Sequence, residues 1–210
     1  MAASPIAQKA ARHLGEADPK LKGLIWRVGV WDIDWSPGGF HALARAIIYQ
    51  QISGAAGNSI YRKTRKVAGT RGFPPAQWFV GASDEQLRSG GLSPQKIGYL
   101  RDLSRRVVDG EIDFTRFRHL TDEKIIEELT EVKGIGRWTA QMYLLFHMRR
   151  PDVLPTGDLG LRKGVQRVYG YGSLPSEKTV LRHGNRWHPY CSWGTYYMWR
   201  SLDAEKLNGA

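Results

Sequence analysis

Residues 129–161 have the sequence LTEVKGIGRWTAQMYLLFHMRRPDVLPTGDLGL, and this stretch decides how the rest of the chain is interpreted. An apolar-patterned segment ends at Val132-Lys133, Gly134-Ile135-Gly136 forms a tight turn, and a helical pattern runs from Arg137 to about Met148. A proline-containing loop over residues 151–157 then places Asp158 at the start of the next helix. The stretch therefore predicts a helical hairpin followed by one carboxylate at a helix N-terminus.

The hairpin turn has the features of a phosphate site. Glycine at 134 and 136 lets the backbone adopt a positive φ and lie close to a ligand. The amides after Gly136 open a helix, so their N–H groups and the helix dipole point at whatever occupies the turn. A DNA phosphate fits, and Lys133 and Arg137 add positive charge. A Gly-x-Gly alone is weak evidence, because many are plain turns.

Composition favours the same kind of partner. The 210 residues include 31 Lys plus Arg against 20 Asp plus Glu, a formal net charge of +11. Such a balance favours a polyanion, although general solubility is the alternative. Eight Trp and nine Tyr offer flat faces that suit bases as well as a protein core. Nucleic acid is therefore the expected partner.

Cys191 is the only cysteine, which excludes a disulfide within the chain and any cluster held by several thiolates. The six histidines show no recognisable ligand spacing, so a structural zinc is not expected. No segment has the pattern of a signal peptide or a membrane helix. We expect a cytoplasmic protein that does not bind membranes.

Nearly every segment has a helical pattern, and no alternating strand pattern of useful length occurs. The second helix is expected over residues 21–31, and the last runs from Cys191 to Leu202. Helix starts are predicted at Ser4-Pro5, Ser36-Pro37, Ser83, Ser93-Pro94, Thr121 and Ser176. The fold class is all-α, with about ten helices.

These motifs resemble the helix-hairpin-helix DNA glycosylase superfamily. The hairpin positions that match are Leu129, Val132, Gly134, Ile135, Gly136, Thr139 and Ala140. The loop at 154–160, LPTGDLG, is similar to the family's aspartate loop, and Asp158 follows Gly136 by 22 residues, as the catalytic aspartate does in that family. An aspartate that begins a helix is most often only its N-cap, but the two roles can coexist. The resemblance implies that Asp158 is catalytic.

It also implies a fold of two helical lobes with a DNA-binding cleft between them, within one domain over 1–210. One lobe would span about 33–118. The other would combine about 1–32 with 119–210 and contain the hairpin at 121–148. Further matches are Asp-Pro-Lys at 18–20 and the segments 46–53, 91–96 and 187–190.

One position distinguishes the branches of this superfamily. Glycosylases that also cut the backbone carry a lysine two places after the second hairpin glycine, where this chain has Trp138. The lone cysteine excludes the iron–sulfur loop of the endonuclease III branch. The chain instead resembles the monofunctional 3-methyladenine DNA glycosylase family, related to the bacterial alkylation-inducible enzyme. It is too short and too helical to contain the N-terminal β lobe of that larger relative.

The resemblance assigns further roles. Gln51 would fill the gap left by an extruded base, with Ile52 as the alternate, although a capped helix end explains this turn too. Ser93 and Lys96 would contact the opposite strand, but a helix start explains Ser93 equally well. The full set of expected DNA contacts is Gln51, Ile52, Ser93, Lys96, Lys133, Gly134, Gly136, Arg137 and Thr139.

The base pocket is expected to be aromatic, because methylated purines are cationic and an electron-rich ring attracts a cation. Trp138 and Trp199 occupy the family's pocket positions, with Tyr49 and Tyr143 as further candidates. The sequence departs from the family pattern at Met142, Leu159, Cys191 and Arg200, and Cys191 stands where an arginine is expected. These departures affect the expected substrate range rather than the reaction class.

The implied activity is hydrolytic excision of alkylated purines, such as 3-methyladenine and 7-methylguanine, from double-stranded DNA in base excision repair. We expect a monomer, nucleoid-associated in a bacterium, with no catalytic metal and no cofactor. A structural Na⁺ or K⁺ could bind hairpin carbonyls near Val132 and Gly134. The alternatives are a non-catalytic DNA-binding module and a bifunctional glycosylase/lyase.

Overall fold

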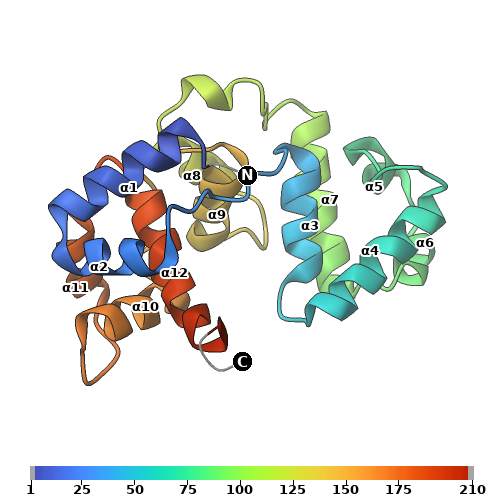
Figure 1. Cartoon of the computed structure of the whole chain (residues 1–210). Helices are drawn as coiled ribbons and strands as arrows, with labels where there is room; N and C mark the ends of the chain where they lie inside the picture. Colours follow the sequence, from blue (N-terminus) through green and yellow to red (C-terminus); the bar gives the residue numbers. More distant parts are fainter. Residues whose placement is uncertain (1–2, 208–210) are drawn as a thin grey trace. The chain divides into compact units, whose positions relative to one another are not determined.

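The computed structural model describes residues 3–207, with side chains described as far as Asp203. Within these residues the chain forms twelve α-helices and one short 3-10 helix and contains no strand (Figure 1). The predicted all-α fold is confirmed. The chain divides into a terminal unit, Met1–Trp35 with Leu144–Ala210, and a central unit, Ser36–Tyr143.

The central unit is built from consecutive helices between residues 36 and 143. They are α3 (Phe40–Tyr49), α4 (Gly54–Ala68), α5 (Ala76–Gly81), α6 (Asp84–Ser89), α7 (Pro94–Val108), the 3-10 helix η1 (Phe117–His119), α8 (Asp122–Thr130) and the first part of α9 (Arg137–His147). Helix α7 packs against α3, α5 and α6, while α4 packs on α3 and α6. The core includes Leu43, Ile47, Phe79, Leu100 and Leu103, all almost fully buried.

The terminal unit combines both ends of the chain. Its helices are α1 (Pro5–Ala17), α2 (Pro19–Val28), the end of α9, α10 (Leu159–Tyr169), α11 (Glu177–Gly184) and α12 (Cys191–Leu207). Helix α12 packs against α1, α2 and α10. Gly164 allows the close α10–α12 contact, since a Cβ there would lie 2.4 Å from the Met198 carbonyl oxygen.

Asp18 anchors the terminal unit from within. Its carboxylate is fully buried, caps α2 through the N–H of Lys20 at 3.0 Å, and accepts from the Tyr169 hydroxyl at 2.5 Å. Arg186 lies 3.1 Å away and balances the charge. A buried carboxylate is tolerated when it is paired and hydrogen-bonded, as it is here. Asp18 thus links the start of α2 to α10 and to the turn after α11.

Several predicted boundaries differ from the structure. The helix expected at Ser36-Pro37 begins at Phe40, because Gly39 has φ +85° and breaks any helix passing through it. Helix α2 begins at Pro19 rather than 21 and ends at Val28, and α12 extends to Leu207. The sequence pattern does not predict the short helix α5. Residues 119–143, which the prediction placed with the chain ends, group with the central unit.

Candidate DNA interface and catalytic residue

The hairpin turn of the central unit uses its two glycines differently. Gly134 has φ +83°, and an added Cβ would lie 2.2 Å from Cδ2 of Tyr99, so both the backbone and the packed ring require glycine there. An added Cβ at Gly136 would meet nothing within 4 Å. Gly134 is therefore needed to form the turn, while Gly136 leaves room beside it.

Two contacts fix the turn to neighbouring helices. The Lys133 N–H donates to Oδ2 of Asp102 on α7 at 2.9 Å. The Gln50 side-chain amide donates to the carbonyl oxygen of Gly134 at 2.8 Å, which joins the hairpin to the end of α3. Sequence reasoning missed Gln50, Tyr99 and Asp102 because all are distant from the hairpin in the chain. Each holds the turn in one conformation.

The expected intercalating loop has an unusual backbone. Gln51 adopts φ +58°, a conformation uncommon outside glycine, and its side chain is exposed. Ile52 is 37% exposed, and Ser53 caps α4 through its hydroxyl. The loop lies one residue after Gln50, whose side chain holds the hairpin. Strain of this kind is concentrated at functional sites, so the loop suits the intercalating role, and the choice between Gln51 and Ile52 stays a prediction.

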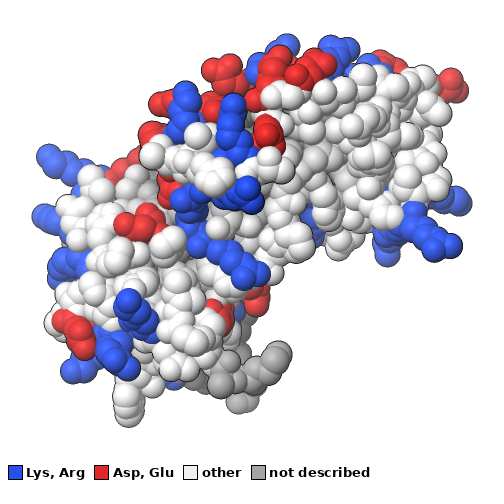
Figure 2. Space-filling model, turned by 90° about the horizontal axis from the view of Figure 1, so that it is seen from above, with Lys and Arg blue, Asp and Glu red and all other residues white. Residues whose placement is uncertain are grey.

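The two basic residues beside the turn, Arg137 and Lys133, have different surroundings. Arg137 forms two bonds to Glu123, at 2.6 and 2.9 Å, and this contact lowers the pKa of Glu123. Lys133 is exposed and borders a shallow groove. The groove is lined by Pro94, Gln95, Gly98, Tyr99, Arg101, Asp102, Arg105 and Lys133. In Figure 2 basic side chains lie mainly over the left part of the face, interspersed with acidic ones, and several acidic side chains gather along the upper edge.

Of the other predicted backbone contacts, Ser93 and Lys96 already have structural partners and Thr139 is nearly buried. Ser93 is the N-cap of α7 and accepts from the Lys96 N–H at 3.3 Å. The Lys96 ammonium donates to the Ile48 carbonyl oxygen at 2.5 Å, near the end of α3, and burial lowers its pKa. Thr139 is only 9% exposed. Their roles on DNA stay predictions.

The expected monovalent cation would need carbonyl oxygens of the turn. The Val132 carbonyl accepts from the Ile135 N–H at 3.0 Å, and the Gly134 carbonyl accepts from Gln50. A carbonyl oxygen has two lone pairs, so each can still coordinate an ion. The donor set fits a hard monovalent cation, and the cation stays a proposal.

Asp158 of the terminal unit is the N-cap of α10, and it is held by more than that helix. Its Oδ1 accepts from the Leu161 N–H at 2.5 Å and from the Trp199 indole Nε1 at 2.7 Å. Trp199 in turn stacks on Phe146, with centroids 5.9 Å apart and planes 13° apart. A side chain that only capped a helix would not need the second donor. The indole fixes the orientation of the carboxylate.

Gly160 makes the indole contact possible. A Cβ at this position would lie 3.0 Å from Nε1 of Trp199 and 3.1 Å from Oδ1 of Asp158. Any side chain here would therefore press on the hydrogen bond between the two residues. Sequence reasoning noted Gly160 only as part of the loop motif, and the contact across 41 residues gave no local signal.

The four aromatic candidates have different surroundings. Trp199 contacts Asp158, and Trp138, in the first turn of α9, is 52% exposed. Tyr143 is 4% exposed and its hydroxyl accepts from the Gly39 N–H at 2.8 Å. The Tyr49 ring lies beneath the Arg45 guanidinium, 4.3 Å from its centroid, and against Gly57. Both tyrosines are packed side chains, and their pocket role gains no support from these contacts.

The departures from the family pattern also have visible surroundings. The Arg200 guanidinium lies 4.0 Å from the Trp31 ring centroid, so it covers an aromatic face instead of supplying one. Leu159 is 53% exposed at the start of α10. Cys191 is fully buried at the start of α12. Nothing in the structure explains Met142.

Comparison with known proteins agrees with this architecture. Residues 44–189 match the model of the HhH-GPD superfamily of base excision DNA repair proteins. DNA-3-methyladenine glycosylase 1 of Schizosaccharomyces pombe is 30% identical over 197 residues, which is 92% of this chain and 86% of that protein.

Solved structures give the same result. The DNA-3-methyladenine glycosidase of Bacillus halodurans superposes with a TM-score of 0.85 at 34% identity, covering 94% of this chain and 89% of that one. The S. pombe 3-methyladenine DNA glycosylase Mag1, solved in complex with abasic DNA, gives 0.81 at 31% identity, covering 91% and 95%. This chain belongs to the HhH-GPD superfamily of base excision DNA repair proteins, in its 3-methyladenine DNA glycosylase family. The predicted family is confirmed.

No helix within residues 3–207 is both long and apolar enough to cross a bilayer.

Proposed function

We propose that this protein is a monofunctional DNA glycosylase that extrudes alkylated purines from duplex DNA and hydrolyses their N-glycosidic bond. The observation that carries the proposal is the orientation of Asp158, whose Oδ1 is held by the α10 backbone and by Trp199. Family membership supports the reaction class. The basic groove beside the hairpin supports DNA as the partner.

The chemistry follows from the charge of the substrate. A purine methylated at N3 or N7 carries a positive charge, so it leaves as a neutral base and strong general-acid catalysis is less necessary than in an ordinary glycosidase. The C1′–N bond breaks and the sugar develops oxocarbenium character. The Asp158 carboxylate would stabilise this positive charge and orient the water whose oxygen forms the new bond to C1′. The water proton leaves through the carboxylate or to solvent.

The hairpin would bind the DNA backbone while Gln51 or Ile52 fills the gap left by the extruded base. A Na⁺ or K⁺ on the carbonyls of Val132 and Gly134 would assist phosphate binding without taking part in the reaction. Trp138 and Trp199 would stack on the cationic base. We further propose that the protein acts as a monomer in the cytoplasm, at the nucleoid if the host is a bacterium.

The product distinguishes this function from its alternatives. Trp138 stands where a lyase carries its lysine, so no amine is available there for a Schiff base. The abasic strand should therefore remain uncut, and borohydride should trap no covalent adduct. A strand break with a trapped adduct would instead identify a bifunctional lyase.

The central experiment measures base release from duplexes that contain 3-methyladenine, 7-methylguanine, ethenoadenine or hypoxanthine. We expect release of the cationic methylpurines to be fastest, because their leaving groups are already activated. Tight binding of every duplex without release of any base would identify a non-catalytic module and overturn the proposal.

A further inference from the structure

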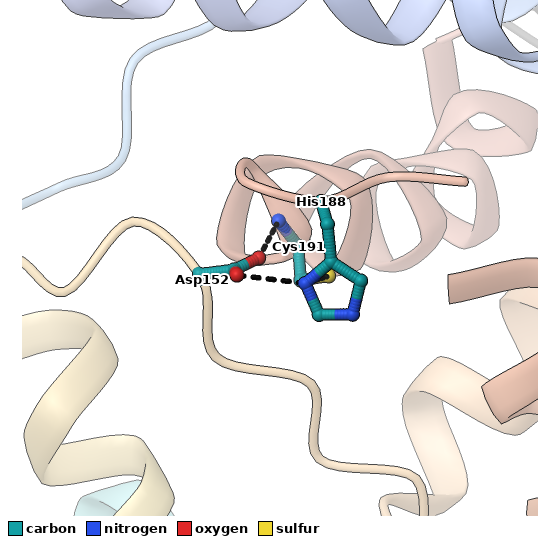
Figure 3. Close-up of side chains that lie close together, drawn as sticks. All are labelled: Asp152, His188 and Cys191. Carbon is teal, nitrogen blue, oxygen red and sulfur yellow. Dashed lines mark hydrogen bonds and ion pairs between the residues drawn. The ribbon is translucent and has the colours of Figure 1, made fainter. Parts of the chain in front are cut away.

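Three side chains of the terminal unit converge outside the proposed catalytic site: Asp152, His188 and Cys191 (Figure 3). Nδ1 of His188 lies 2.7 Å from Oδ2 of Asp152 and 3.5 Å from Sγ of Cys191. One donor atom from each residue lies within 4.8 Å of the other two. Asp152 lies in the loop after α9, His188 in the loop after α11, and Cys191 is the first residue of α12.

We infer that Asp152, His188 and Cys191 form a binding site for zinc, or for a divalent ion of similar ligand preference. A carboxylate, an imidazole and a thiolate are the three side-chain types that zinc takes in proteins. None of the three residues has a role in the predicted DNA or base site, and Cys191 occupies a position where the family resemblance leads one to expect an arginine. An arginine could not be a ligand.

One of the ligand distances already suits a tetrahedral ion, and a second would have to lengthen. With Zn–S of about 2.3 Å and Zn–N or Zn–O of about 2.1 Å, adjacent ligands lie about 3.6 Å apart for S and N and about 3.4 Å apart for N and O. The Sγ–Nδ1 distance of 3.5 Å already matches. The Nδ1–Oδ2 distance of 2.7 Å is that of a hydrogen bond. It would open by about 0.7 Å as the ion replaces the shared proton.

The backbone around the ligands is fixed in advance. The Cys191 N–H donates to Oδ1 of Asp152 at 3.2 Å, which leaves Oδ2 directed at the imidazole. The Ser192 N–H donates to the Pro151 carbonyl at 3.0 Å, and the Ser192 hydroxyl accepts from the Val153 N–H at 3.0 Å. These bonds fasten the loop to the start of α12. Little ordering would therefore remain when the ion binds.

The three proposed ligands differ in how far they are exposed to solvent. Cys191 is fully buried, whereas the side chains of His188 and Asp152 are 50% and 33% exposed. An ion would thus have protein on the sulfur side and solvent on the other, with water as the fourth ligand. Zinc takes cysteine as its thiolate, so binding of the ion would release the Cys191 proton.

A catalytic Cys-His-Asp arrangement does not fit this geometry. Such a triad needs the carboxylate on one imidazole nitrogen and the nucleophile on the other. Here both the Asp152 carboxylate and the Cys191 sulfur contact Nδ1 of His188. One donor atom from each of the three residues, all within 4.8 Å of one another, is the arrangement that a shared ion requires. The role we infer is structural, since the ion would pin the loop that precedes Asp158 to the helix that carries Trp199.

The single cysteine makes the test specific. We would titrate the metal-free full chain with Co²⁺ and record the thiolate-to-cobalt charge-transfer band, which in this chain can arise only from Cys191. We expect a saturable band at one ion per chain, displaced by Zn²⁺ and absent from Cys191→Ser. Absence of the band in the wild type would overturn the site.

Asp152 and His188 are not buried, so they allow a test that does not depend on replacing a buried residue. His188→Ala and Asp152→Asn should each weaken Co²⁺ and Zn²⁺ binding at least tenfold, while His119→Ala, an exposed histidine in η1, should leave it unchanged. Zn²⁺ should also raise the Tm of the wild type but not of His188→Ala. Equal Zn²⁺ affinity in His188→Ala and wild type would show that the three residues form only a hydrogen-bonded cluster.

Discussion

The N-terminal ends of α9 and α10 are built for opposite purposes. Helix α9 follows Gly136, which has no side chain to cap it, and an added Cβ there would meet open space. Helix α10 follows Asp158, whose carboxylate caps the helix and also accepts from Trp199. Each helix attracts an anion at its N-terminus, through its own unpaired N–H groups and its own dipole. We propose that the α9 end binds an external phosphate, whereas the α10 end holds the chain's own carboxylate.

This difference assigns DNA binding to the α9 end and catalysis to the α10 end. A mutation should therefore be able to impair one of these functions without the other. Changes at the α10 end should affect the excision rate, whereas changes at the α9 end should affect DNA affinity. A variant that lowered both equally would show that the two ends do not act separately.

The largest effect is expected for Asp158→Asn. The amide oxygen can still accept from the Leu161 N–H and from Trp199, so α10 should remain capped, but the negative charge is lost. The single-turnover rate of 3-methyladenine release should fall by about 10²- to 10⁴-fold with little change in Kd for DNA. Asp109→Asn, an exposed carboxylate after α7, is the control. Retention of the wild-type rate would remove Asp158 from the mechanism.

A smaller loss is expected for Trp199→Phe. Phenylalanine can still stack on Phe146 but cannot donate to Asp158. Loss of a hydrogen bond to a charged group should slow single-turnover release roughly 10- to 100-fold. Trp138→Phe, which likewise keeps a ring at the other predicted pocket tryptophan, serves as the comparison. If the two variants lose activity equally, stacking on the base rather than orientation of Asp158 explains the role of Trp199.

The sequence predicted the turns and helix caps of these two sites but not the contacts that join them to other helices. The Gly134–Gly136 turn, the cap at Asp158 and most helix starts depend on residues within a few positions, so their signals are local. The contacts of Gln50 with Gly134 and of Trp199 with Asp158 span 84 and 41 residues. Such contacts depend on helix packing, which a single sequence does not specify.

The same reasoning explains one wrong helix start and one side-chain cluster that the sequence did not indicate. Ser36-Pro37 has the form of a helix start, but Gly39 takes φ +85° two residues later and delays the helix to Phe40. The histidines were judged by sequence spacing, yet His188 and Cys191 at i and i+3 meet Asp152 from 36 residues earlier. The short His-x-x-Cys spacing was the one local sign of that cluster.

Within the hairpin, substitution of Gly134 should lower the stability of the fold, and substitution of Gly136 should lower DNA affinity. Gly134→Ala forces an alanine into φ +83° against the Tyr99 ring, and the free energy of unfolding should fall by at least about 1–2 kcal/mol. Gly136→Ala meets nothing within 4 Å, so its Tm should stay unchanged while DNA affinity falls. Thermal unfolding and fluorescence anisotropy measure the two effects. Unchanged DNA affinity in Gly136→Ala would show that no phosphate approaches that side of the turn.

The smallest effect concerns the two cations that flank the turn. Lys133 is exposed, whereas Arg137 is bound by two bonds to Glu123. Each phosphate that a cation neutralises contributes about 0.9 to the slope of log Kd against log salt concentration. Lys133→Ala should lower that slope by about this amount, and Arg137→Ala by less, because Glu123 already offsets its charge.

Glu123→Gln decides whether the ion pair restrains Arg137. Without the carboxylate, the guanidinium should become available to DNA, so affinity should rise slightly and the salt slope should steepen. Arg137→Ala in the Glu123→Gln background should then cost more than in the wild type, as a double-mutant cycle on DNA affinity measures. If Arg137→Ala costs as much as Lys133→Ala in the wild type, the pair with Glu123 must open when DNA binds, and the α9 end is charged by two cations rather than one.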